Sequence, residues 1–154
     1  MKASIILVGT LLLLSLSGCD LFQDPSGDKA EIQALVKQFA EAAQKDINGM
    51  LAMYEQSPGT VSIGNGEIQR GIEAIRKSAD TDLVTVLGKF KYDLGSIEVT
   101  PLGRGYALAV TPFIMTANSA TPFARQLKGV STLVWKKTTD GWKVVHEHDS
   151  LQPS

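Results

Sequence analysis

The sequence predicts an α+β domain in which N-terminal helices pack on one face of a strongly curved antiparallel sheet. Apolar residues at helical spacing end near Lys77, and the rest of the chain is rich in Val, Ile, Thr, Phe, Tyr and Trp. Glycine-containing turns separate the later segments, which is typical of strands that run antiparallel to their neighbours. Because the helices precede the strands, the two kinds of element should form separate layers.

The N-terminal half predicts three helices and one short hairpin. Asp28, with Glu31 three residues later, resembles a capping box and marks the start of an amphipathic helix. Asp46 predicts the start of a second helix, because its carboxylate can accept backbone N–H bonds from the following turn, and Asn48-Gly49 weakens any continuous helix. The expected elements are helices over 28–45 and 47–55, strands over 60–63 and 67–70, and a short helix after Gly71.

The second half predicts five strands. Pro112 cannot donate a hydrogen bond to a sheet ladder, so it should bend its strand or mark an edge. A single compact domain is expected, because the chain contains no internal repeat and no second linker. The predicted strands cover residues 89–94, 96–101, 105–117, 123–137 and 142–149.

The N-terminus predicts export followed by lipid anchoring. Lys2 precedes an apolar run over 5–16, and small residues lead to Cys19, the single cysteine of the chain. This arrangement resembles the lipobox of bacterial lipoproteins. It implies a lipoprotein signal peptide over 1–18, a Cys19 that carries diacylglycerol and often a further acyl chain such as palmitate, and a tether over 19–27. An ordinary cleaved signal or an uncleaved signal anchor is the alternative.

The resemblance also predicts an address and a first partner. A lipoprotein of this kind lies in the bacterial cell envelope, held to the lipid bilayer and facing the periplasm or the cell exterior. Asp20 follows the modified cysteine and, in enterobacteria, resembles a signal for retention in the inner membrane. Two or more acyl chains hold a protein stably at a membrane, whereas one does not.

Composition excludes several classes of function. The chain has 15 Lys and Arg against 16 Asp and Glu, which is no footprint of nucleic-acid binding. With Cys19 lipidated, no thiol remains for a disulfide, a nucleophile or a metal ligand. Gly64-Asn65-Gly66 is a turn signal rather than a dinucleotide fingerprint, and no phosphate loop is present. We therefore expect no cofactor and no metal.

The last predicted hairpin carries a family resemblance. Asp140-Gly141-Trp142 forms its turn, and the stretch His146-Glu147-His148-Asp149-Ser150 ends it. Both resemble the final hairpin of the NTF2-like superfamily, in its SnoaL-like and DUF4440 branch, and the order of elements agrees over roughly residues 30–151. The resemblance implies a cone over 28–154, in which a bent sheet wraps a long helix around a central pocket. It also implies a homodimer through the exposed sheet face, which Thr111, Met115, Val130 and Val134 would fit.

Alternation along the final strand suggests which residues face that pocket. It places Trp142, Val144, His146 and His148 on one face, which is the better candidate for the inner face. The two histidines would then be a proton donor and acceptor, a ligand-orienting pair or two metal ligands. Alternatively, one is structural and the other faces solvent. The predicted pocket residues are Phe39, Tyr54, Trp135, His146 and His148.

The steroid isomerases of this fold give a catalytic alternative. They use a carboxylate base with a Tyr and a protonated Asp. When Asp46 is matched to their equivalent turn, Phe39 falls at the tyrosine position and Ser62 or Ile63 at the base, and none of these can do that chemistry. Tyr54 and Tyr92 remain as possible donors.

Our leading hypothesis from the sequence is a membrane-anchored domain that binds a small apolar or amphipathic ligand, or a partner protein, without catalysis. The alternative is a SnoaL-like or steroid-isomerase-like enzyme that performs isomerisation, dehydration or cyclisation with His146, His148 and Tyr54. One property distinguishes the two hypotheses, because an enzyme of this kind needs a titratable group inside the cavity and a binding protein does not.

Overall fold

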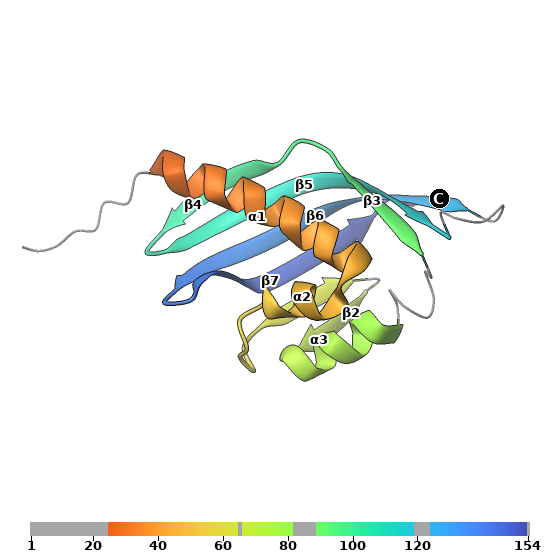
Figure 1. Ribbon diagram of the computed structural model, residues 1–154, viewed down its shortest axis with the longest axis horizontal. Helices are drawn as coiled ribbons and strands as arrows, with labels where there is room; N and C mark the ends of the chain where they lie inside the picture. Colours follow the sequence, from red (N-terminus) through yellow and green to blue (C-terminus); the bar gives the residue numbers. More distant parts are fainter. Residues whose placement is uncertain (1–24, 65, 82–88, 119–123, 154) are drawn as a thin grey trace, which may run out of the picture.

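The computed structural model describes residues 25–64, 66–81, 89–118 and 124–153, with side chains from residue 28 onward. The predicted signal peptide, Cys19, the tether up to residue 24 and the predicted strand start at residue 123 lie outside the described residues. Figure 1 shows the helix α1 lying across one face of a curved sheet, with α2, α3 and the β1–β2 hairpin beside it. The predicted α+β arrangement is confirmed. Within the described residues, no helix is long and apolar enough to cross a membrane.

The helices match their predicted positions with differences at the ends. The first, α1, spans Pro25–Lys45 and begins three residues before the predicted start. Proline suits the first turn of a helix, because the N–H that it lacks would have no helical partner there. The second, α2, spans Ile47–Ala52 and stops before Tyr54, which instead forms a parallel bridge with Val144. The third, α3, spans Ile72–Ala79.

The described residues form one mixed sheet of seven strands. Its order is β2-β1-β7-β6-β5-β3, and β4 also pairs with β5. All pairs are antiparallel except β1 with β7, which are parallel. The prediction of a wholly antiparallel sheet is wrong for that one pair, because no tight turn joins β1 to β7 and restricts their directions. The strands are β1 Val61–Gly64, β2 Glu67–Arg70, β3 Phe90–Leu94, β4 Glu98–Gly103, β5 Tyr106–Ala117, β6 Arg125–Thr138 and β7 Gly141–Leu151.

Pro112 lies where β5 changes neighbours. The strand β4 pairs with β5 as far as Val110, and β3 pairs with it from Phe113 onward. Between these two regions no neighbouring strand needs a donor from β5, so a proline is tolerated there. The carbonyl of Pro112 still accepts a hydrogen bond from the Gly95 N–H at 2.7 Å. Pro112 thus lies at a gap on the β3 and β4 side of β5, while its pairing with β6 continues opposite Val130.

One extra residue in β7 decides which side chains face inward. Trp135 of β6 pairs with Val144, but the preceding Val134 pairs with His146, so Val145 is unpaired and forms a bulge. On the other edge, Val144 bonds to the segment at Met53 and Glu55, whereas β1 begins opposite His146. The bulge therefore sits where β7 changes neighbours, and it reverses the alternation of side chains beyond it.

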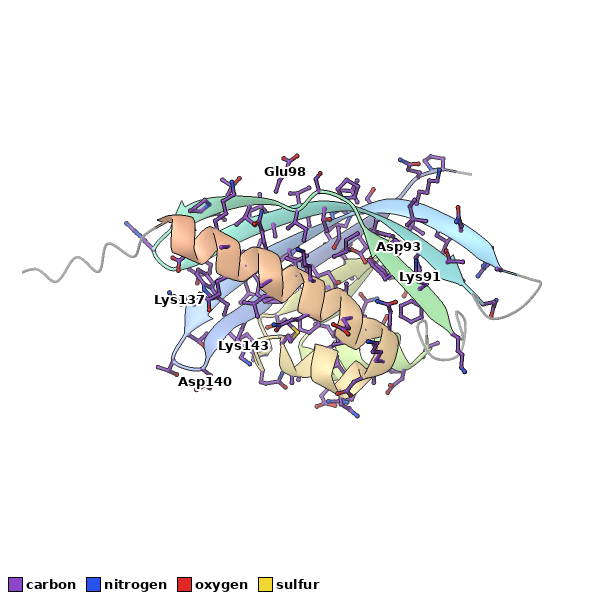
Figure 2. All side chains as sticks on the ribbon, turned by 45° about the horizontal axis from the view of Figure 1, so that its top comes forward. Lys91, Asp93, Glu98, Lys137, Asp140 and Lys143 are labelled. Carbon is purple, nitrogen blue, oxygen red and sulfur yellow. The ribbon has the colours of Figure 1, made fainter. Side chains whose placement is uncertain are left out.

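The hydrophobic core lies between α1 and the inner face of the sheet. At one end of this core, polar contacts join the last hairpin to the start of α1. Trp142 Nε1 donates a hydrogen bond to Glu31 Oε2 at 3.2 Å, and Lys137 forms an ion pair with Asp28 at 3.0 Å. Figure 2 shows Lys137 near the first turns of α1. The core includes Ile32, Val36, Phe39, Leu51, Tyr54, Ile75, Leu133, Trp135 and Val144.

Candidate functional site

A cavity of about 310 Å³ lies between the inner face of the curved sheet, β1 included, and the helices α2 and α3. A second space of about 70 Å³ lies beneath α1. Both are lined by Met50, Tyr92, Glu147 and Asp149, so the two carboxyl groups stand where the spaces meet. The larger cavity is lined by Met50, Tyr54, Ser62, Ile63, Gly64, Gln69, Ile75, Ser78, Ala79, Tyr92, Phe113, Met115, Arg125, Leu127, Glu147, Asp149 and Leu151.

Glu147 is held by two hydroxyl donors. The hydroxyls of Tyr54 and Ser62 both donate to its Oε2, the latter at 2.8 Å. Ser62 lies directly beside Glu147 in the parallel β1–β7 pair, and the bridge of Tyr54 to Val144 holds the tyrosine close by. Burial raises the pKa of Glu147 above its ordinary value, although both hydrogen bonds act to lower it. Burial, reinforced by the charge of Glu147, also raises the pKa of Tyr54 well above its ordinary value.

Asp149 lies two residues farther along β7 and therefore on the same face as Glu147. Burial, together with the charge of Glu147, raises the pKa of Asp149 from 3.8 to about 7, while a hydrogen bond with Ser131 opposes this. Its Oδ1 is buried and has no hydrogen-bond partner among the described residues. Because each carboxylate disfavours ionisation of the other, one of the two acids readily stays protonated near neutral pH.

Gly64 leaves room beside Asp149. The two residues are paired across β1 and β7, and a Cβ atom on Gly64 would meet no heavy atom within 4 Å. Gly64 follows Ser62 by two residues, so its missing side chain would point to the same face as the Ser62 hydroxyl. The open space next to the acid pair thus exists because β1 carries a glycine there.

The rest of the larger cavity is mainly apolar. The rings of Tyr92 and Phe113 stack with their centroids 4.8 Å apart. Arg125, the only basic residue among the described lining residues, is exposed and begins β6, six residues before Ser131, which pairs with Asp149. Six strand residues span roughly 20 Å, so the cavity is acidic at its inner end and basic at its rim.

The predicted pocket residues meet different outcomes. Tyr54 lines the larger cavity, and Phe39 lines the smaller one, where its ring meets that of Tyr54 edge to face at 5.5 Å. Trp135 is 0% exposed in the core and lines neither space. His146 and His148 line neither, and they lie on the opposite face of β7 from Glu147.

The prediction that the histidines face inward was wrong, and the acids were missed, for one reason. Strict alternation through Val145 predicts that the histidines face inward, whereas the bulge there places Glu147 and Asp149 on the inner face. One feature of the sequence indicates the bulge. The adjacent Val144 and Val145 interrupt the alternation of apolar and polar residues.

The isomerase comparison also changes with the geometry. Ser62 does line the cavity, but its hydroxyl supports a carboxylate rather than acting as a base. Ile63 lines the cavity beside it. The carboxyl groups come from the last strand and not from the position that the comparison assigned to a base. In the described residues, no group of three or more His, Cys, Asp or Glu could hold a metal ion.

Two of the four residues expected at a dimer interface face the interior. Thr111 is 2% exposed and lines the smaller space, and Met115 is 8% exposed and lines the larger. That part of the prediction was wrong, because the inner face of β5 carries its odd-numbered residues. Val130 is 38% exposed on the outer face, and Val134 follows it there by four residues.

A family model described as AtzH-like matches residues 24–154. The chain belongs to the AtzH-like family. None of the curated protein sequences is significantly similar to this AtzH-like chain.

Solved structures place this AtzH-like protein in the NTF2-like fold. A candidate dehydratase of the NTF2-like family from Streptomyces avermitilis superposes with a TM-score of 0.74 at 18% identity, covering 84% of this chain and 99% of that one. An NTF2-like superfamily protein from Salmonella enterica gives a TM-score of 0.71 at 23% identity, with 84% and 94% covered. A DUF3225-family protein of unknown function from Pectobacterium atrosepticum gives 0.66 at 25% identity, with 83% and 93% covered. The predicted NTF2-like cone is confirmed.

Proposed function

We propose that this protein is a lipid-anchored cell-envelope protein that binds a small, partly apolar molecule in the cavity beside Glu147 and Asp149, without transforming it. The observation that carries the proposal is the cavity of about 310 Å³ with an acid pair at its inner end. Small-molecule sites commonly have about 300–1,000 Å³, apolar walls and a few polar groups that orient the ligand.

The polar groups favour a ligand site over a simple packing gap. A buried acceptor without a partner, such as Asp149 Oδ1, costs about 1–3 kcal/mol. Native proteins keep such groups rarely and usually for a reason. A bound molecule that donates a hydrogen bond to this oxygen would remove the cost, and the space beside Gly64 would admit it.

The anchor and the assembly belong to the same proposal. Lipidation at Cys19 is supported by the signal-peptide pattern and by the short interval before α1 begins at Pro25. In enterobacteria, Asp20 would favour the inner membrane. A homodimer or a protein partner would cover the outer sheet face, where Ile114 and Val130 are exposed on adjacent strands.

Native mass spectrometry of the full-length protein extracted from membranes tests all three parts. We expect the mass of an acylated dimer and an additional retained small molecule. The variant Gly64→Val should lose the retained molecule, because valine fits a strand and would fill the space beside Asp149.

The matched control is Thr100→Val, which also introduces valine into a strand but at an exposed position of β4. This variant should retain the molecule. If the wild-type protein and Gly64→Val carry the same added mass, or neither carries any, binding in this cavity is wrong.

Proton transfer is the second candidate function. Its version with His146 and His148 loses its physical basis, because those side chains do not line the cavity. The version that remains uses Asp149, whose pKa of about 7 suits a general base near neutral pH, with the Tyr54 hydroxyl nearby. Incubating the retained molecule with the protein in deuterium oxide would distinguish the functions. Deuterium incorporation at carbon that is lost in Asp149→Asn favours proton transfer, and its absence favours binding alone.

A further inference from the structure

We infer that the ligand of this cavity is an amphipathic amine, whose protonated nitrogen pairs with Asp149 and Glu147 while its apolar body lies along Tyr92, Phe113 and Leu127. The inference rests on the proposed small-molecule binding and adds the chemical class and the orientation of the molecule.

Charge is the first argument. Glu147 and Asp149 present two carboxyl groups to one space, and in the described residues no Lys or Arg forms an ion pair with either. A buried negative charge without a positive partner is unfavourable, so a cation is the complementary ligand group. A carboxylate or phosphate at the same place would be repelled.

Hydrogen-bonding capacity is the second argument. Oε2 of Glu147 already accepts from Tyr54 and Ser62, whereas Oδ1 of Asp149 has no partner among the described residues. An ammonium group carries three donors and no acceptor, which suits a site made of acceptors. A neutral hydroxyl offers one donor and no charge, so it would satisfy the site only in part.

The walls are the third argument. Tyr92 and Phe113 form a stacked aromatic pair that lines the cavity, and Met50, Ile75 and Leu127 add apolar surface. Aromatic faces attract cations and also pack well against an apolar body.

The position of Arg125 indicates how the ligand is oriented in the cavity. It lies at the rim, roughly 20 Å of strand from the residue that pairs with Asp149. An amine therefore enters with its nitrogen leading, while its far end lies near a positive charge and is neutral or anionic.

Protonation of the acid pair gives the inference a pH dependence. Besides Asp149, the lining groups of the described elements that carry a charge or can ionise are Glu147, Tyr54, Tyr92 and Arg125, and α1 contributes only apolar side chains. Burial beside Glu147 raises the pKa of Asp149 to about 7, so an amine must displace a proton at lower pH. Amine binding should therefore strengthen between pH 6 and pH 8 by about fivefold to tenfold.

The test compares three probes of one shape: 2-phenylethylamine, 2-phenylethanol and phenylacetate. Their binding to the full-length protein in detergent micelles is measured by calorimetry at pH 7.5, with Gly64→Val in the same detergent to subtract binding outside the cavity. We expect the amine to bind at least tenfold more tightly than the alcohol, and phenylacetate not to bind. Asp149→Asn should reduce the preference for the amine below threefold.

Asp140→Asn is the matched control, because Asp140 is exposed in the turn at the end of the β6–β7 hairpin (Figure 2) and does not line the cavity. It should leave the preference unchanged. Equal binding of amine and alcohol, or tighter binding of phenylacetate, overturns the amine class and leaves cavity binding intact. If no probe binds to the wild-type protein more tightly than to Gly64→Val, both the amine class and cavity binding are overturned. The comparison of the amine with the alcohol in the wild-type protein remains a test of the amine class even if a variant fails to fold.

Discussion

At the scale of single residues, Asp149 combines three properties that rarely occur together in a purely structural carboxyl group. Its Oδ1 is buried without a partner among the described residues, it faces a second buried acid, and it borders open space at Gly64. Burying such a pair lowers the stability of the folded chain unless protons or a ligand compensate. Asp149 is therefore the residue whose properties depend most on what occupies the cavity.

The first prediction concerns stability against pH. Because the pKa of Asp149 is raised from 3.8 to about 7, the folded protein keeps a proton that the unfolded chain releases between those values. The free energy of unfolding should therefore fall as pH rises through this window, by on the order of 2 kcal/mol between pH 5 and pH 8. The raised pKa of Glu147 acts in the same direction. Urea denaturation of Asp149→Asn should show a smaller fall.

Asp140→Asn, at its exposed position, serves as the control and should follow the wild-type profile. If Asp149→Asn and the wild-type protein lose the same stability over this range, Asp149 is not held protonated by the fold.

At the scale of elements, β7 shows what could and could not be predicted from the sequence. The sequence predicts a strand over 142–149, and β7 spans Gly141–Leu151 with Trp142 and Val144 facing inward as predicted. Beyond them the assignment reversed, because the extra residue at Val145 depends on where Tyr54 and β1 meet the strand edge. Those segments lie far away in sequence, so periodicity within β7 carries no information about them. Tyr54 could be predicted as a cavity residue, whereas Glu147 and Asp149 could not.

Two glycines of this sheet, Gly129 and Gly64, give the second prediction. A Cβ on Gly129 in β6 would lie 2.5 Å from the Ser150 carbonyl oxygen and 2.6 Å from Phe113 Cζ, whereas one on Gly64 would meet nothing. Gly129→Ala must therefore push the Phe113 ring or the backbone of β7, and overpacking of this kind costs about 1–3 kcal/mol. Gly64→Ala should change stability by less than about 0.5 kcal/mol.

Thermal or urea unfolding of both variants checks this prediction. Equal stability of the two alanine variants would mean that the β6 backbone does not require glycine against Phe113.

At the scale of the whole molecule, the start of α1 and the cavity rim lie at opposite ends of β6. Lys137 near one end pairs with Asp28 in the first turns of α1, close to where the chain arrives from Cys19. Arg125 begins the other end, up to about 40 Å of strand away. Only five residues lie between Cys19 and Pro25, so a fully extended chain would span at most about 20 Å from one to the other. An anchored domain would thus present its cavity away from the bilayer.

The third prediction follows from the anchor. Replacement of Cys19 by serine removes the thiol that would carry the lipid, so Cys19→Ser should leave the membrane fraction and lose the mass of the acyl chains. Fractionation with mass spectrometry of the recovered protein checks both effects, and Ser17→Ala, two residues earlier, is the control that should remain anchored. A Cys19→Ser protein that stays with membranes at the wild-type level contradicts lipidation at this residue.

Carboxyl ¹³C NMR titration of the isotopically labelled protein tests most directly whether β7 presents an acid pair to the cavity and whether that pair binds an amine. We expect the Asp149 carboxyl to titrate near pH 7 and to shift to lower pH by about one unit when 2-phenylethylamine saturates the cavity. An Asp149 carboxyl that titrates near 4, or one that does not respond to the amine while the amine binds, would contradict it.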